Sequence, residues 1–257
     1  MNFFTPKSAA ERYAKGRPYF HPLVIQRSKE FLSLREPLRR ALDLGCGTGL
    51  STIALKEIAS VVVGVDASRE MIALAPEDSR ITYLVSSAEN LPFGESEFDL
   101  ITMSQVFHWL DRGRFFAEAR RVLRADSWLI IYDNYFSAQI DGNAEFHRWH
   151  RDSYLERYPS PPRAWASFAA EGVEDEGFHL LHHEEIENTM RFSPEGLVDY
   201  LVTQSNVIAA VEGGGEKIGD VRAWLTESTR PFFGDAEEVG FLFRAPVWFL
   251  RRAGRQL

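Results

Sequence analysis

A glycine-rich run lies between a strand-like segment and a helix-like segment of this chain. The run extends from Asp43 to Gly49, directly after the apolar pair Ala41-Leu42 and directly before residues 50–58. Glycine lets a ligand approach the backbone closely, and the start of a helix offers unpaired N–H groups with a partial positive charge. Asp66 follows 17 residues after Gly49, where a carboxylate can accept hydrogen bonds from both hydroxyls of a ribose. The pattern predicts a site for a nucleoside ligand.

The spacing of the glycines separates two nucleoside ligands. A dinucleotide site uses Gly-x-Gly-x-x-Gly, whereas Gly45, Gly47 and Gly49 give Gly-x-Gly-x-Gly. Asp43 stands two residues before the first glycine, where a negative charge would oppose a pyrophosphate and suit an ammonium group. S-adenosylmethionine carries an ammonium and a carboxylate where NAD carries phosphates, so the residues favour S-adenosylmethionine. The alternative from another class is a nucleoside- or NAD-binding protein without methyl transfer.

Five short apolar runs at similar spacing indicate a parallel sheet. They occupy residues 41–44, 61–65, 81–85, 100–103 and 128–132. Helix-like stretches lie between them, at residues 50–58, 69–74 and 115–123. Strand, crossover helix and strand in alternation are typical of an open, doubly wound α/β sheet. Ligands of such sheets bind beyond the carboxyl ends of the strands, so the loops after each strand are expected to form the site.

The motifs over residues 40–133 resemble those of the class I S-adenosylmethionine-dependent methyltransferases, within them the type 11 small-molecule group. Residues 63–71 are similar to that family's second motif, residues 86–93 to its adenine-side motif, and residues 98–101 to its fourth strand. The resemblance implies a Rossmann-like seven-stranded sheet whose last strand is antiparallel. It also implies a cofactor site in which the glycine run holds the methionine end, Asp66 the ribose and the later residues the adenine. The cofactor-binding residues are then Asp43, Gly45, Cys46, Gly47, Thr48, Gly49, Asp66, Ala67, Met71, Ser87, Ala88 and Ser104.

Two positions depart from the family pattern. Ser87 stands where the family usually has an aspartate that meets the adenine amino group, and a serine accepts only a weaker, uncharged hydrogen bond. Adenine recognition is therefore expected to depend on the backbone of Ala88. Residues 125–127 replace the usual Pro-Gly-Gly turn before the fifth strand, which concerns turn geometry away from the site.

The residues after the fourth strand suggest where the methyl acceptor binds. The segment from Gln105 to Trp109 resembles a branch that includes trans-aconitate methyltransferases and related carboxyl methyltransferases. Tyr13 and Arg17 look like the lid of that branch. The resemblance implies His108 as the catalytic residue, with Gln105, Trp109, Tyr13 and Arg17 on the substrate side. The structural alternatives are a capping His108, a core Trp109, and a surface position for Tyr13 and Arg17.

The class of acceptor stays open between two chemistries. A carboxylate is already ionised and needs no base, so O-methylation of a carboxylate is one prediction. A phenol, an amine or an activated carbon needs a base, and the ordinary pKa of a histidine suits His108 to that role.

The rest of the chain is predicted to complete a single methyltransferase domain over residues 1–257. We expect N-terminal lid helices over residues 1–38 and a cofactor-binding core over 39–134. An aromatic cap insertion is expected over 135–178, and the remaining sheet and substrate side over 179–257. Ser193-Pro194 predicts a helix start, with the helix ending at residues 213–215. A short helix around residues 221–228 and a closing strand over 238–251 follow.

The charge balance and the cysteine content exclude several classes. The chain has 257 residues with 29 Lys and Arg against 37 Asp and Glu, a net charge of −8, which disfavours a broad nucleic-acid-binding surface. Cys46 is the only cysteine, so no intrachain disulfide forms, and its position indicates a filler role. No apolar window is long enough for a spanning helix. We expect a cytoplasmic protein that acts on a small molecule, with neither nucleic acid nor membrane as partner and with an oligomeric state that the sequence leaves open.

The histidines outside the site invite a metal-binding interpretation. His147 and His150 are three residues apart, and His179, His182 and His183 follow. No His-Glu-x-x-His run and no cysteine partner accompany them. The sequence therefore predicts no bound metal, and the surrounding aromatic residues are expected to pack in the cap or core.

Overall fold

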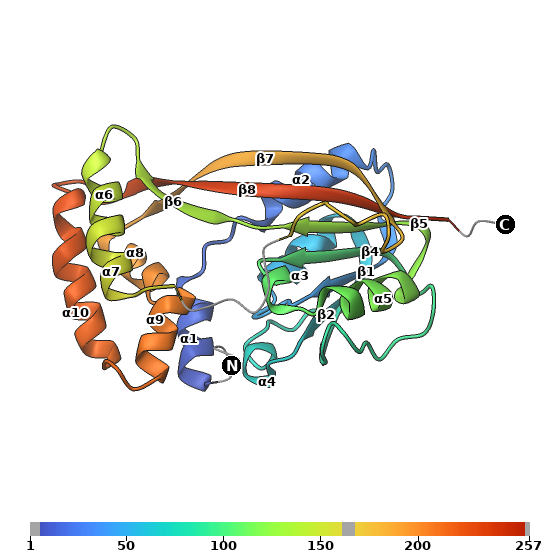
Figure 1. The fold of residues 1–257 in the computed structure, drawn as a ribbon, viewed down its shortest axis with the longest axis horizontal. Helices are drawn as coiled ribbons and strands as arrows, with labels where there is room; N and C mark the ends of the chain where they lie inside the picture. Colours follow the sequence, from blue (N-terminus) through green and yellow to red (C-terminus); the bar gives the residue numbers. More distant parts are fainter. Residues whose placement is uncertain (1–5, 161–167, 255–257) are drawn as a thin grey trace. The chain divides into compact units, whose positions relative to one another are not determined.

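The computed structural model of the protein describes residues 6–160 and 168–254. These residues form two compact units (Figure 1). Unit 1 takes the described parts of Met1–Pro18, Tyr135–Pro162 and Glu187–Arg244. Unit 2 takes those of Tyr19–Asn134, Arg163–Ile186 and Ala245–Leu257. Each unit has its own hydrophobic core, so each is considered by itself.

Unit 2 contains the predicted parallel strands. They are β1 (Leu38–Leu44), β2 (Ala59–Asp66), β3 (Ile81–Val85), β4 (Phe98–Ser104) and β5 (Leu123–Tyr132). Their order is β3-β2-β1-β4-β5, with every pair parallel. The last strand, β8 (Val239–Arg252), pairs antiparallel with β5 between Val247 and Arg251. The predicted doubly wound α/β fold with an antiparallel last strand is confirmed.

Two further strands pair with β8. β6 (Tyr135–Ile140) is antiparallel to it and ends the seven-strand path β3-β2-β1-β4-β5-β8-β6. β7 (Phe178–Phe192) also pairs with β8 but is not part of that path, so it is the eighth strand of the sheet. The sequence analysis missed β7 because polar side chains fill most of its positions. Its inward side is nonetheless visible as a period of two, in which Phe178, Leu180, Ile186, Met190 and Phe192 are the less exposed residues.

The helices of unit 2 connect the strands and cover the core. They are α2 (His21–Phe31), α3 (Leu50–Ala54), η1 (Leu55–Glu57), α4 (Arg69–Ile72), η2 (Phe107–Trp109) and α5 (Arg112–Val122). α5 buries one face of apolar residues, consisting of Phe115, Phe116, Ala119 and Val122. The side chain of Asp111 caps its first turn by accepting a 3.1 Å hydrogen bond from Arg114 N. The predicted helix over 50–58 is α3 continued by the tighter η1.

Unit 1 is built from helices around an aromatic core. Its helices are α1 (Lys7–Gly16), α6 (Ala144–Trp149), the π-helical η3 (His150–Tyr154), α7 (Leu155–Arg157), α8 (Pro194–Leu201), α9 (Ser205–Glu212), α10 (Ile218–Thr229) and η4 (Arg230–Phe232). The expected single helix from Pro194 to residue 212 is divided into α8 and α9. The break comes at Gln204, whose backbone is extended with ψ of 142° before α9 begins.

The unit boundaries differ from the expected cap over residues 135–178. Phe146, Tyr154 and Tyr158 pack in the core of unit 1, together with residues of the 192–243 stretch. Phe168 and Phe178 pack in the core of unit 2. The expected lid helices divide in the same way, because α1 belongs to unit 1 and α2 to unit 2. Residues 161–167 of the expected cap lie outside the described residues.

No helix within residues 6–160 and 168–254 is both long and apolar enough to cross a bilayer.

His150 makes the stability of unit 1 depend on pH. Its ring stacks on Tyr154 at 5.1 Å and meets Phe136 edge-on at 5.6 Å. Burial, with a smaller contribution from the nearby His147, lowers the pKa of His150 from 6.5 to about 4. In the unfolded chain His150 binds a proton below about pH 6.5, whereas in the folded protein it binds one only near pH 4. The unfolded state therefore binds more protons between these pH values, so acidification through this window favours unfolding.

We expect His150→Phe to remove this pH dependence. Urea unfolding at pH 7.5 and pH 4.5 should show that the wild type loses about 2 kcal/mol more than the variant on acidification. His147→Gln is the matched control, because it removes an exposed histidine of the same helical segment and should retain the dependence. Equal pH dependence in His150→Phe and the wild type would contradict the assignment.

Candidate functional site

The glycine run forms a tight loop between β1 and α3. Gly45, Gly47 and Gly49 have φ of +66°, +55° and +84°, the left-handed region that glycine alone enters without strain. Gly45 N and Cys46 N both donate to the carbonyl oxygen of Val65 at the end of β2, at 2.7 and 3.1 Å. The loop therefore has a fixed shape at the carboxyl edge of the sheet, where a ligand is expected.

Asp66 joins the end of β2 to this loop. Its Oδ2 accepts a 2.8 Å hydrogen bond from Gly47 N, and its Oδ1 accepts one of 2.8 Å from Ser68 N. A carboxylate has about four acceptor positions, so these two bonds orient the group and leave capacity for two ribose hydroxyls. Burial raises the pKa of Asp66 above 3.8, and this effect is larger than that of the backbone N–H bonds, which lower the pKa. The geometry suits the predicted ribose contact.

Asp43 is placed differently from the expectation that it faces an ammonium group. It is 0% exposed, and its Oδ2 accepts hydrogen bonds from Ser51 Oγ at 2.6 Å and Thr52 Oγ1 at 2.7 Å. Its Oδ1 accepts a third from Thr102 Oγ1 at 3.0 Å. The carboxylate thus connects β1 with α3 and β4 beneath the loop. Direct contact with a ligand stays a prediction, and the observed contacts give Asp43 a part in holding the loop.

Cys46 and Thr48 complete the loop as buried residues. Cys46 is 4% exposed, and burial raises the pKa of its thiol well above the ordinary value of 9.0. A buried thiol of raised pKa is a poor nucleophile, which agrees with the predicted filler role. Thr48 is similarly buried, as are Gly47 and Gly49 on either side of it.

The predicted adenine-side residues lie after β2 and β3. Ala67 precedes α4, whose first turn is capped by Ser68 Oγ accepting from Met71 N at 3.2 Å. Met71 and Ala88 are buried, whereas Ser87 is exposed. Ser87 Oγ donates to the carboxylate of Glu89, a residue that the sequence analysis missed. The Ser-x-Glu spacing was the available signal, since it places a carboxylate beside the serine that replaces the family's aspartate.

The end of β4 brings two predicted residues, Ser104 and Gln105, to the same edge of the sheet. Ser104 pairs with Tyr132 of β5, and its hydroxyl is buried without a hydrogen-bond partner among the described residues. Gln105 has φ of +57°, unusual for a residue with a side chain and typical of functional sites. Its N donates to Tyr132 O at 3.1 Å and its Nε2 donates to Asn134 O at 3.0 Å. The amide that was predicted to meet the substrate is therefore engaged with the backbone after β5.

His108 and Trp109 follow in the short helix η2. Their rings lie 4.8 Å apart at 49°, and His108 is 9% exposed. η2 begins directly after Val106, which packs against Gly45 of the glycine loop. The cofactor-side predictions and the acceptor-side residues Gln105, His108 and Trp109 thus lie within one unit, on the loops after β1, β2, β3 and β4.

Tyr13 and Arg17 belong to unit 1. The Arg17 guanidinium lies 4.7 Å from the ring centre of Tyr13 and 5.8 Å from that of Tyr200. Its Nη2 donates to Thr203 O at 3.2 Å. These contacts join Arg17 to α1 and to the end of α8, and the substrate role of both residues stays a prediction.

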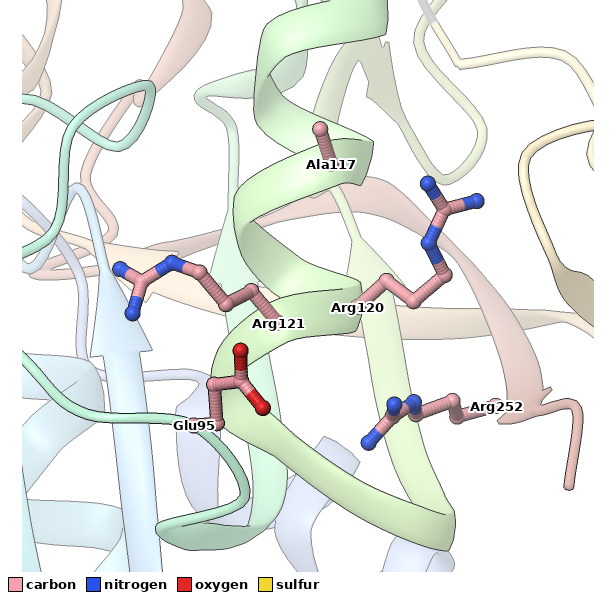
Figure 2. A pocket seen from close by; sticks show the side chains of 5 residues that line it. All are labelled: Glu95, Ala117, Arg120, Arg121 and Arg252. Atoms are coloured by element: carbon pink, nitrogen blue, oxygen red, sulfur yellow. The ribbon is translucent and has the colours of Figure 1, made fainter. Parts of the chain in front are cut away.

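A hollow of about 280 Å³ elsewhere in unit 2 is separate from this site. Glu95, Ala117, Arg120, Arg121 and Arg252 line it (Figure 2). It adjoins the last turn of α5 and the amino end of β4, opposite the edge that carries the glycine loop. Its arginines hold the local structure: Arg121 pairs with Glu118, Arg120 donates to Glu176 O, and Arg252 donates to Leu123 O.

The residues at the carboxyl edge fit S-adenosylmethionine. The glycine loop places three left-handed glycines at this edge, Asp66 offers oriented acceptor positions, and the Ser104 hydroxyl, which has no hydrogen-bond partner among the described residues, offers a polar contact. No group of three or more His, Cys, Asp or Glu side chains suited to a metal ion occurs among the described residues.

Comparisons with known proteins agree with this geometry. Residues 42–131 match a family described as a methyltransferase domain. A Dictyostelium discoideum protein named as a methyltransferase is 26% identical over 223 residues, which cover 82% of this chain and 80% of that protein. A Mycobacterium bovis protein named as an uncharacterized methyltransferase is 29% identical over 206 residues, covering 79% and 77%. A solved structure from Anaeromyxobacter dehalogenans, named as a type II methyltransferase, is 25% identical with a TM-score of 0.65, covering 93% of this chain and 97% of that one.

Proposed function

This chain belongs to the class I S-adenosylmethionine-dependent methyltransferases, and we propose that it methylates a small molecule, with the oxygen of a carboxylate as the first candidate acceptor. The observation that carries the proposal is the placement of His108 and Trp109. They follow β4 in the same unit as the glycine loop and Asp66, and Val106 of the same turn packs on Gly45.

The cofactor supplies a methyl group that its sulfonium has already activated. The protein itself must bind the cofactor, orient the acceptor and exclude water. Asp66 and the glycine loop bind the nucleoside and methionine parts. The Trp109 ring forms an apolar wall, and the His108 imidazole orients the acceptor oxygen by a hydrogen bond. A carboxylate acceptor requires no proton transfer, so in that reaction His108 acts as an orienting group.

The second candidate acceptor is a phenol, an amine or an activated carbon. His108 supports it, because an imidazole in this position can accept the proton that such an acceptor loses. The two candidates differ in their response to pH. Transfer to a phenol should fall as His108 is protonated, whereas transfer to a carboxylate should depend little on that proton.

Binding experiments test the cofactor assignment before any acceptor is known. Isothermal titration of the full chain with S-adenosylmethionine, S-adenosylhomocysteine and NAD should show binding of the first two and none of NAD. Small carboxylic acids and phenols can then be screened with S-adenosylmethionine labelled in the methyl group. Binding of NAD alone would overturn the proposal.

We expect His108→Ala to lower kcat/KM for the identified acceptor about tenfold through lost orientation, and about 100-fold or more where a base is required. S-adenosylhomocysteine affinity should change less than about twofold, because a lost acceptor contact leaves the cofactor contacts in place. His108→Gln is the matched variant: it can donate a hydrogen bond but is a poor base, so it should rescue the carboxylate reaction only. Full turnover and acceptor affinity in His108→Ala would show that His108 is structural.

A further inference from the structure

Two glycines of the loop lie against side chains from neighbouring strand ends. A Cβ added at Gly45 would lie 2.7 Å from Val106 Cγ1 and 2.9 Å from Val106 Cβ. A Cβ added at Gly49 would lie 3.0 Å from Tyr83 Cζ and closer still to the Tyr83 hydroxyl. Real Cβ atoms do not approach neighbours this closely, so Val106 and Tyr83 occupy the space that side chains at these positions would need.

Tyr83 reaches the loop from β3, although β2 lies between them. The register places Asp43, Gly64 and Tyr83 side by side on β1, β2 and β3. Gly64 has no side chain, and a Cβ there would lie 2.7 Å from Tyr83 Cδ1. The absence of a side chain at Gly64 therefore lets the tyrosine ring extend across β2 and bring its hydroxyl end to Gly49.

Val106 is held in place from the other side. Gln105, directly before it, donates from its backbone to Tyr132 O and from its side chain to Asn134 O. Val106 O in turn accepts a 2.8 Å hydrogen bond from Trp109 N, which closes the turn that carries His108. Val106, whose side chain touches Gly45, thus belongs to a segment that is hydrogen-bonded to β5 and that continues into the turn carrying His108.

We propose that Val106 and Tyr83 are positioning residues that fix the glycine loop from its two ends, with Val106 also linking the cofactor loop to the His108 turn. Neither residue needs to touch the cofactor. Each sets the shape of backbone that the cofactor meets, through one glycine: Val106 through Gly45 and Tyr83 through Gly49.

A crossed rescue experiment tests this pairing. Gly45→Ala and Gly49→Ala should each weaken S-adenosylhomocysteine binding about tenfold or more, because each adds an overpacked methyl to a left-handed residue. Val106→Ala should restore at least about threefold in the Gly45→Ala background and leave Gly49→Ala unchanged. Tyr83→Phe, which removes only the hydroxyl, should restore binding in Gly49→Ala and leave Gly45→Ala unchanged. Part of the loss of affinity should remain in each double variant, because alanine stays strained in the left-handed backbone conformation.

Isothermal titration with S-adenosylhomocysteine gives the affinities, and amide hydrogen exchange of residues 45–49 in the ligand-free protein gives a second readout. Val106→Ala and Tyr83→Ala alone should speed exchange in the loop, whereas Val61→Ala, an exposed valine of β2, should not. This second readout applies even where a glycine variant does not fold. Rescue of both glycine variants by the same second substitution, rescue of neither, or loop exchange unchanged in Val106→Ala and Tyr83→Ala would each overturn the proposal.

Discussion

Replacing Asp66 by alanine should weaken S-adenosylhomocysteine binding about 10- to 100-fold, or about 1–3 kcal/mol. The variant loses the proposed acceptor for the ribose hydroxyls and also the bond from Gly47 N that ties the glycine loop to β2. Isothermal titration at pH 8 measures the effect directly. Both losses act in the same direction, which makes this the largest expected effect on cofactor binding.

Asp66→Asn separates the two losses. Its amide oxygen can still accept from Gly47 N, whereas its amide nitrogen can no longer accept from Ser68 N. The bond to the loop should therefore remain, and the loss of affinity should be smaller than in Asp66→Ala. Asp126→Ala, which removes an exposed carboxylate of the same unit, is the control and should change affinity less than about twofold. An Asp66→Ala protein that binds with unchanged affinity would show that the ribose lies elsewhere.

The same carboxylate should make cofactor affinity depend on pH. Burial raises the pKa of Asp66 above 3.8, so protonation begins at a higher pH than for an ordinary aspartate. The protonated group loses acceptor capacity, so affinity should fall on acidification at a higher pH than an ordinary aspartate would give. Asp66→Asn should bind with an affinity that depends less on pH.

The parallel core of the fold could be predicted from sequence because most residues of its central strands are buried on both faces. Runs such as 61–65 and 100–103 are continuous and apolar, and the glycine run marks the end of the first strand unmistakably. β7 could not be found by the same rule, since its outward residues are polar and its inward ones include Glu184 and Asn188. The division between α8 and α9 was hidden because the apolar pattern continues through the break at Gln204.

The sequence could place the motif residues in the fold but not their contacts with residues far away in the chain. Gly45 to Gly49 and Asp66 lie at the carboxyl ends of β1 and β2, where the motif puts them, and their contacts with a ligand stay predictions. Sequence spacing cannot show that Asp43 is enclosed by hydroxyls from two other elements, or that the Gln105 amide is engaged with Asn134 O. Such contacts join residues that are far apart in the chain, so only the folded geometry reveals them.

Removing the carboxylate of Asp43 should cost about 3 kcal/mol of folding free energy or more. Asp43→Ala leaves the hydroxyls of Ser51, Thr52 and Thr102 buried without their common acceptor, and each buried polar group that loses its partner costs about 1–3 kcal/mol. The expected cost is below the sum of these three penalties, because the hydroxyls of Ser51 and Thr52 can instead donate to backbone carbonyls of their own helix. Urea unfolding at pH 7.5 measures the loss.

A double-mutant cycle distinguishes these hydrogen bonds from the cavity that alanine leaves. Asp43→Asn keeps the shape of the side chain, and Thr102→Val keeps the shape of the threonine. If the Thr102 hydroxyl is bonded to the carboxylate, the two substitutions should be non-additive by about 1 kcal/mol. Strict additivity would mean that the hydroxyl contributes nothing through Asp43.

The pH dependence of the same variants gives an independent check with a definite sign. Burial raises the pKa of Asp43 from 3.8 to about 6, even though the three hydroxyl bonds lower it. A raised pKa in the folded state stabilises the fold fully below pH 3.8, and this stabilisation is lost as the pH rises through about 6. The shift of about two pKa units corresponds to about 3 kcal/mol.

His150 acts in the same pH window with the opposite sign, because its folded pKa is lowered. The wild-type curve therefore combines two opposing terms, and the contribution of Asp43 is found by subtracting the curve of Asp43→Asn from it. That difference should change by about 3 kcal/mol between pH 7.5 and pH 4, with the wild type gaining relative to the variant on acidification. A flat difference would show that Asp43 has an ordinary pKa in the folded protein, which would contradict the effect assigned to its burial.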